Sequence, residues 1–97
     1  MKKGYWLTFY HSVSNPAALA EYAPLATAAI QAGGGRFLVR STPSKISEAG
    51  LNQRTIVIQF DSVEQAIATY EGPAYQAAVK VLDGAVERDV RFVEGVE

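Results

Sequence analysis

The sequence predicts one α+β domain of the ferredoxin-like βαββαβ type, with a four-stranded antiparallel sheet and its helices on one face. Segments rich in β-branched and aromatic residues alternate with segments of helical period, in the order strand, helix, strand, strand, helix, strand. The chain has 97 residues, which suits a single domain over 1–97. Hydrophobic residues make up 48% of it, enough to form a core.

The first strand and helix are predicted at 4–12 and 17–32. Residues 4–12 are rich in aromatic and β-favouring side chains. Pro16 fits the first helical position, where its missing N–H costs nothing. Pro24 removes a backbone donor inside the helix, so we expect a kink or a break there. The glycines at 33–35 end the helix, and one of them should be left-handed.

Two strands are predicted at 36–41 and 54–60. The connection between them, 42–53, contains proline, glycine and scattered polar residues. It is expected to be irregular, with room for a short extra strand at 45–47.

The second helix is expected in two pieces, followed by the last strand at 89–94. Ser62 followed by Gln65 forms a capping box that begins the first piece. Gly72 ends that piece, and Pro73 begins the second.

Alternation along the strands assigns side chains to two faces of the sheet. The almost wholly apolar set is expected to pack on the helices: Leu7, Phe9, Phe37, Val39, Ile56, Ile58, Phe60, Val90 and Phe92. The opposite set is half apolar: Trp6, Thr8, Tyr10, Leu38, Arg40, Val57, Gln59, Arg91 and Val93. This second face is too apolar for free solvation, so we expect a homodimer in which a second sheet covers it. The alternative is a monomer with an apolar sheet face.

Composition excludes several classes of protein. Nine Lys and Arg against ten Asp and Glu leave a net charge of −1, so neither nucleic acid nor an anionic membrane is an expected partner. The absence of cysteine excludes disulfides, thiolate metal sites and a cysteine nucleophile. No apolar run approaches the roughly 20 residues of a membrane helix. Polar residues interrupt the N-terminal apolar stretch, so we expect a cytoplasmic protein rather than a secreted one.

Two arginines are candidates for ligand binding. Arg36 and Arg40 lie four residues apart on one strand and should point to the same side. Paired guanidiniums suit a carboxylate or a phosphate. Gln59 is assigned to the same face as Arg40 and is a third candidate. The alternative is that these arginines pair with glutamates or with the partner subunit.

Aromatic residues and one histidine complete the candidate site. His11 is the only histidine and could act as a general base, or could simply be solvated. Tyr22 and Tyr75 lie on the inner sides of their helices, either as pocket residues or as core aromatics with a polar tip near water. Carboxylates do not cluster by spacing, so no metal site is expected. The glycines at 33–35 follow a helix, the reverse of a phosphate cradle, and no cofactor is expected.

The stretch 34–40, with Tyr22 before it and 73–76 after it, resembles the domain-of-unknown-function 1330 family. The opening residues 3–6, the strand 56–60 and the closing residues 93–95 are also similar to that family. The resemblance covers nearly the whole chain. It implies a dimeric α+β barrel, a superfamily that includes cofactor-free monooxygenases, haem-degrading enzymes, isomerases and proteins with no established activity.

The chain departs from the family pattern at several positions. The family usually has an acid where Gln59 stands, so this chain lacks the carboxylate that could have served as a base beside Arg40. The other departures replace a glycine pair, a serine and a basic residue, at Ser41-Thr42, Gly72 and Leu82.

Three functions remain open on this evidence. The first is a cofactor-free enzyme acting on a small anionic or aromatic molecule, with Arg40 as anchor, Tyr22 and Tyr75 shaping the pocket and His11 moving a proton. The second is a module that binds a small ligand without converting it. The third is a structural dimer whose polar residues serve only the interface.

Overall fold

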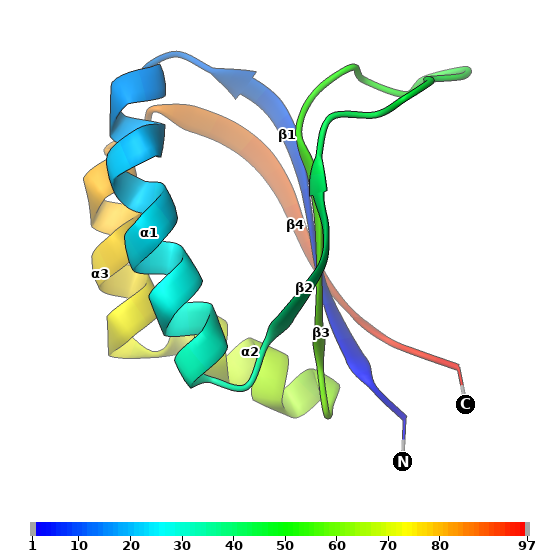
Figure 1. Cartoon of the computed structure of the whole chain (residues 1–97), viewed down its shortest axis with the longest axis vertical. Coiled ribbons are helices and arrows are strands. Elements are labelled where there is room, and N and C mark those ends of the chain that lie inside the picture. The colour runs from blue at the N-terminus through cyan, green and yellow to red at the C-terminus, as the bar shows by residue number, and fades with distance from the viewer. Residues whose placement is uncertain (1, 97) are drawn as a thin grey trace.

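A computed structural model describes residues 2–96, which form four strands and three helices (Figure 1). The elements follow the predicted order: β1 (Gly4–Val13), α1 (Pro16–Ala32), β2 (Arg36–Ser41), β3 (Thr55–Phe60), α2 (Val63–Glu71), α3 (Pro73–Leu82) and β4 (Val86–Glu94).

The strands form one antiparallel sheet in the order β2-β3-β1-β4. All three helices lie on one face of the sheet (Figure 1). Helices α1 and α3 pack side by side, and α2 lies at the end of the sheet where β1 begins. This arrangement confirms the α+β ferredoxin-like fold.

Helix α1 keeps its predicted ends but does not break at Pro24. Of the kink or break expected there, the break is wrong, because α1 runs without interruption and buries one side through Tyr22, Ala26 and Ile30. Tertiary packing of that side outweighs the loss of one backbone hydrogen bond. The left-handed glycine after the helix is confirmed as Gly34, whose φ is +94°.

The segments around β2 and β4 differ from the prediction. Residues 45–47 form no strand, so the expected extra strand is wrong. The irregular connection that contains them projects beyond the sheet (Figure 1). Strand β4 begins at Val86, three residues earlier than predicted, because it continues to pair with the long β1 as far as Val13.

The predicted faces of β1 are reversed. Trp6 lies opposite Ile58 and Thr8 lies opposite Ile56, so Trp6, Thr8 and Tyr10 point toward the helices. Leu7 and Phe9, expected on that side, lie on the other face.

Gly4 explains the reversal. A Cβ atom at Gly4 would lie 2.2 Å from the backbone nitrogen of Val63, so β1 contacts the start of α2 at a position where only glycine fits. Residues two, four and six positions later share that side of the strand.

A β-bulge reverses the end of β2. Phe37 lies opposite Ile58, whereas Val39 lies opposite Val57, so one extra residue is inserted between them. Arg40 then lies opposite Ile56 and faces the helices. The expectations that Val39 packs on the helices and that Arg36 and Arg40 share a side are therefore wrong.

We call the helix-facing side of the sheet the inner face and the other side the open face. The open face carries Tyr5, Leu7, Phe9, Arg36, Val39, Val57, Gln59, Asp89, Arg91 and Val93. Within residues 2–96, no helix covers this face (Figure 1).

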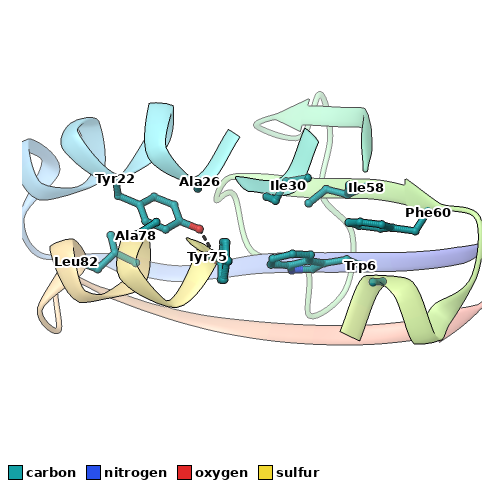
Figure 2. Packing of buried hydrophobic residues seen from close by; sticks show 10 residues of the cluster. Trp6, Tyr22, Ala26, Ile30, Ile58, Phe60, Tyr75, Ala78 and Leu82 are labelled. Atoms are coloured by element: carbon teal, nitrogen blue, oxygen red, sulfur yellow. Dashed lines mark hydrogen bonds between the residues drawn. The ribbon is translucent and has the colours of Figure 1, made fainter. Parts of the chain in front are cut away.

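Trp6 lies at the centre of the core. Its ring packs nearly perpendicular to the Tyr75 ring of α3, with the ring centroids 4.7 Å apart. It lies nearly parallel to the Phe60 ring of β3, at 6.3 Å between centroids. Figure 2 shows these rings in a row with Tyr22, between the helices and the inner face. The aromatic row packs the helices against the sheet.

Candidate functional site

A cavity of about 280 Å³ lies between α1 and the inner face. Its walls are mostly apolar or aromatic: Trp6, Tyr10, Pro16, Leu19, Ala20, Tyr22, Ala23, Ala26, Ile30, Phe37, Ile56, Ile58 and Tyr75. The remaining lining residues are Thr8, Thr27, Arg40, Arg54 and Arg88. We call this space the main cavity, and its size suits a small organic molecule.

A cluster of three polar side chains, the donor cluster, lines this cavity. Arg88 donates from one terminal nitrogen to the Tyr22 hydroxyl at 3.0 Å and from the other to the Tyr75 hydroxyl at 3.1 Å. The two hydroxyls also bond to each other, as Figure 2 shows. The three residues come from β4, α1 and α3, so the cluster forms only in the folded chain.

Burial shifts the pKa of two phenols that line the main cavity, Tyr75 and Tyr10. It raises the pKa of Tyr75, and the neighbouring Tyr22 raises it further, while Arg88 opposes both effects only in part. Burial also raises the pKa of Tyr10, whose ring lies near the Arg88 guanidinium. Tyr75 and Tyr10 therefore keep their protons at neutral pH and have an O–H available to donate.

Two further pairs of polar groups in the main cavity are hydrogen-bonded to each other. Trp6 Nε1 donates to Thr8 Oγ1 at 3.1 Å, and Thr8 is buried. Arg40 donates to Thr27 Oγ1 at 3.1 Å and lies over the Phe37 ring. Three guanidiniums and no carboxylate are found among the described residues that line the cavity, so it favours negative charge.

The structure brings together three of the residues predicted for the site. Tyr22, Tyr75 and Arg40 all line the main cavity. Arg36 and Gln59 lie opposite each other on the open face, where the Gln59 amide donates to Tyr5 instead.

His11 also lies apart from the main cavity. It lines a second cavity of about 250 Å³ beside the connection between β2 and β3, and its nearest charged partner is Glu87 at 3.8 Å. His11 therefore does not share a cavity with Tyr22 and Tyr75, and its expected role in proton transfer stays a prediction.

Sequence reasoning missed Arg88 and Thr8. The sequence predicts the last strand at 89–94, so Arg88 falls one residue before it and is not assigned to either face of the sheet. Val90 and Phe92 were correctly assigned to the helix-facing side, and extending their alternation back by two residues would have included Arg88. Thr8 was missed because the faces of β1 were reversed.

Within residues 2–96, no three His, Asp or Glu side chains gather closely enough to hold a metal ion. No helix of that range is both long and apolar enough to cross a bilayer.

Solved structures share this fold at low sequence identity. RPA0582, a protein of unknown function from Rhodopseudomonas palustris, aligns with a TM-score of 0.73 at 15% identity, over 99% of this chain and 84% of that one. A "putative antibiotic biosynthesis monooxygenase" from Caulobacter crescentus aligns with a TM-score of 0.60 at 17% identity, over 99% and 91%. A dimeric ferredoxin-like protein of unknown function from Thermobifida fusca aligns with a TM-score of 0.60 at 11% identity, over 95% and 90%.

These likenesses establish the fold alone, and no curated protein matches the chain. The family assignment comes from the sequence as a whole. Residues 3–96 match the family described as "Domain of unknown function (DUF1330)", and the chain belongs to that family.

Proposed function

We propose that the chain binds a small anionic molecule with an apolar or aromatic body in the main cavity. One observation carries the proposal: a mostly apolar cavity is lined by Arg40, Arg54 and Arg88, with no carboxylate among its described lining residues. The apolar walls would hold the body of the ligand and the arginines its charge. Arg40 is exposed, so we expect it to guide the ligand in and to add less affinity than the more buried Arg88.

The test is a binding screen of small aromatic and aliphatic acids by isothermal calorimetry and thermal shift. A ligand specific to the folded state raises the unfolding temperature. Ala23→Trp places a large ring at an exposed position of α1 that lines the main cavity, and should abolish binding. Ala28→Trp, exposed on α1 outside the cavity lining, is the matched control and should bind normally. Equal binding by the two variants would contradict the proposal.

Catalysis in the same cavity is the second candidate function. The observation that favours it is the buried donor cluster, because fixed donors stabilise negative charge that develops on an oxygen. Two proteins of this fold carry names of this kind, a "putative antibiotic biosynthesis monooxygenase" and a "Possible Oxidoreductase". Mass spectrometry of bound ligands after aerobic incubation tests it. Ligands recovered unchanged would leave binding alone as the function.

We also propose that the chain works as a homodimer whose open faces meet. Val39 and Val93 remain more than 40% exposed on that face, which also carries Leu7 and Phe9. The Thermobifida fusca protein of the same fold is described as dimeric. Burial of an apolar sheet face against its own copy is a common basis of symmetric dimers.

A further inference from the structure

The donor cluster has more hydrogens than acceptors. The hydroxyls of Tyr22 and Tyr75 bond to each other, which uses one of their two hydrogens. Each oxygen also accepts an N–H from Arg88. The second hydroxyl hydrogen has no acceptor among the side-chain hydrogen bonds found within residues 2–96.

Thr8 adds another such hydrogen on the inner face. Its hydroxyl oxygen accepts from Trp6 Nε1, and in the described part of the chain it donates to no group. Thr8 is only 2% exposed, so bulk water does not serve it. Arg88 adds further donors, because a guanidinium has five N–H groups and the two tyrosines use two of them.

Acceptors are scarce around this end of the main cavity. The Thr27 hydroxyl already donates to the Ala23 carbonyl and accepts from Arg40. No Asp, Glu, Asn or Gln stands among the described lining residues. Side-chain hydrogens without an acceptor therefore outnumber the side-chain acceptors here, and a ligand group that only accepts would find several of them.

We propose, on the basis of the ligand-binding function proposed above, that Arg88, Tyr22, Tyr75 and Thr8 form an oxyanion site that selects a deprotonated carboxylate. A carboxylate has acceptors and no hydrogen, so it complements the unused hydrogens. The surrounding apolar walls exclude water and strengthen each charged hydrogen bond. A neutral group of the same shape would make weaker hydrogen bonds to these donors and would bind less tightly than the carboxylate.

Benzoate and nitrobenzene test the proposal as a pair, because they share shape and acceptor oxygens and differ in charge. Calorimetry on the wild-type protein at neutral pH should show benzoate binding at least about tenfold more tightly than nitrobenzene. Arg88→Met should remove that preference and leave nitrobenzene affinity within about threefold. Arg36→Met, on the open face, is the matched control and should keep the preference.

The outcomes separate the two proposals. Equal wild-type affinity for benzoate and nitrobenzene would overturn the oxyanion site and leave cavity binding intact. A preference that survives in Arg88→Met would place the anion at another arginine, and also overturns it. Binding of neither probe, nor of any acid in the screen, would reject the ligand-binding function and this inference with it. Should Arg88→Met fail to fold, Thr8→Val is expected to weaken benzoate selectively, and unchanged selectivity contradicts the site.

Discussion

At the residue scale, Arg88 is unusual in having phenols rather than a carboxylate as partners. Its guanidinium lies 5.3 Å from the ring centre of Tyr22 and donates to two hydroxyls. A cation over an aromatic face is stabilised by the ring quadrupole, and the hydrogen bonds replace lost water. These contacts satisfy the group without neutralising it, so its positive charge remains available to a ligand.

The protonation of Tyr75 predicts a loss of stability at alkaline pH. The folded state raises the pKa of Tyr75 above the ordinary value of 10.0, mainly through burial. Above about pH 10 the Tyr75 phenol loses its proton in the unfolded chain but keeps it in the folded chain. The contribution of this phenol to the free energy of unfolding is therefore complete below about pH 10 and is lost as the pH rises further. Tyr75→Phe removes this phenol, so the free energy of unfolding should fall by about 1.4 kcal/mol less than in the wild type between about pH 8 and pH 11.

Urea unfolding across that pH range measures the difference. Phe92→Leu is the control, since it loses packing beside Trp6 but removes no titrating group. It should lower stability by a similar amount at every pH. Parallel curves for the wild type and Tyr75→Phe would show that the Tyr75 phenol ionises equally in both states.

Part of this site could be predicted from single residues, and part could not. Tyr22 and Tyr75 were identified because helical spacing shows which side of a helix is buried. Arg88 required the correct start of a strand, and strand ends are set by pairing with distant residues. Nothing in the local sequence of β4 reveals that β1 is long enough to pair with Val86.

At the element scale, Gly4 allows β1 to pack closely against the N-terminus of α2. Ser62 caps this helix as expected, because its hydroxyl accepts the Gln65 N–H at 3.1 Å. The Gln65 side chain does not complete the capping box. It donates at 2.7 Å to the carbonyl of Gly33, which joins α2 to the end of α1.

A methyl group at Gly4 should separate these elements. Gly4→Ala is expected to destabilise the domain by about 3 kcal/mol, because its Cβ would lie 2.2 Å from the Val63 nitrogen and 2.4 Å from the Val63 Cα. Backbone atoms cannot rotate away as a side chain can. Chemical denaturation measures the effect.

Gly84→Ala is the matched control for this substitution. Gly84 has a φ of +75° and open space where a Cβ would stand, so it isolates backbone strain without a clash. Its cost should be about 1 kcal/mol. A Gly4→Ala variant no less stable than Gly84→Ala would mean that β1 and α2 do not contact as described.

The bulge in β2 shows why arginine positions were harder to predict than strand positions. The strand boundaries at 36–41 were predicted correctly. The three apolar residues in its middle fit either face, so an inserted residue leaves no trace in the pattern. Arg36 and Arg40 consequently separate, one to each side of the sheet.

At the scale of the whole molecule, both faces of the sheet carry apolar and aromatic residues. Element order and turn residues were sufficient to predict the fold, since few topologies satisfy them. They were insufficient to assign the faces of β1, where aromatic residues occupy both. The assignment depends on Gly4 and α2, which are far apart in sequence.

The proposed dimer predicts a change of mass when the open face is charged. The wild type should sediment at about twice the 10.5 kDa chain mass. Val57→Lys places a charge beside Leu7 on that face and should give monomers, because an unpaired buried charge is costly. Sedimentation velocity measures both.

Leu25→Lys is the control for added charge. Leu25 is 51% exposed on α1, away from the sheet, and its substitution should leave the dimer intact. A wild-type monomer, or a dimer that tolerates Val57→Lys, would contradict an interface through the open face.

The position of Trp6 gives the protein its own optical reporter. It is the only tryptophan in the chain, it lines the main cavity, and it lies against Tyr75 of the donor cluster. An occupant of the cavity changes the polarity and quenching around one indole ring, and no second indole dilutes the signal. Emission from the unlabelled protein can therefore be used to follow filling of the main cavity.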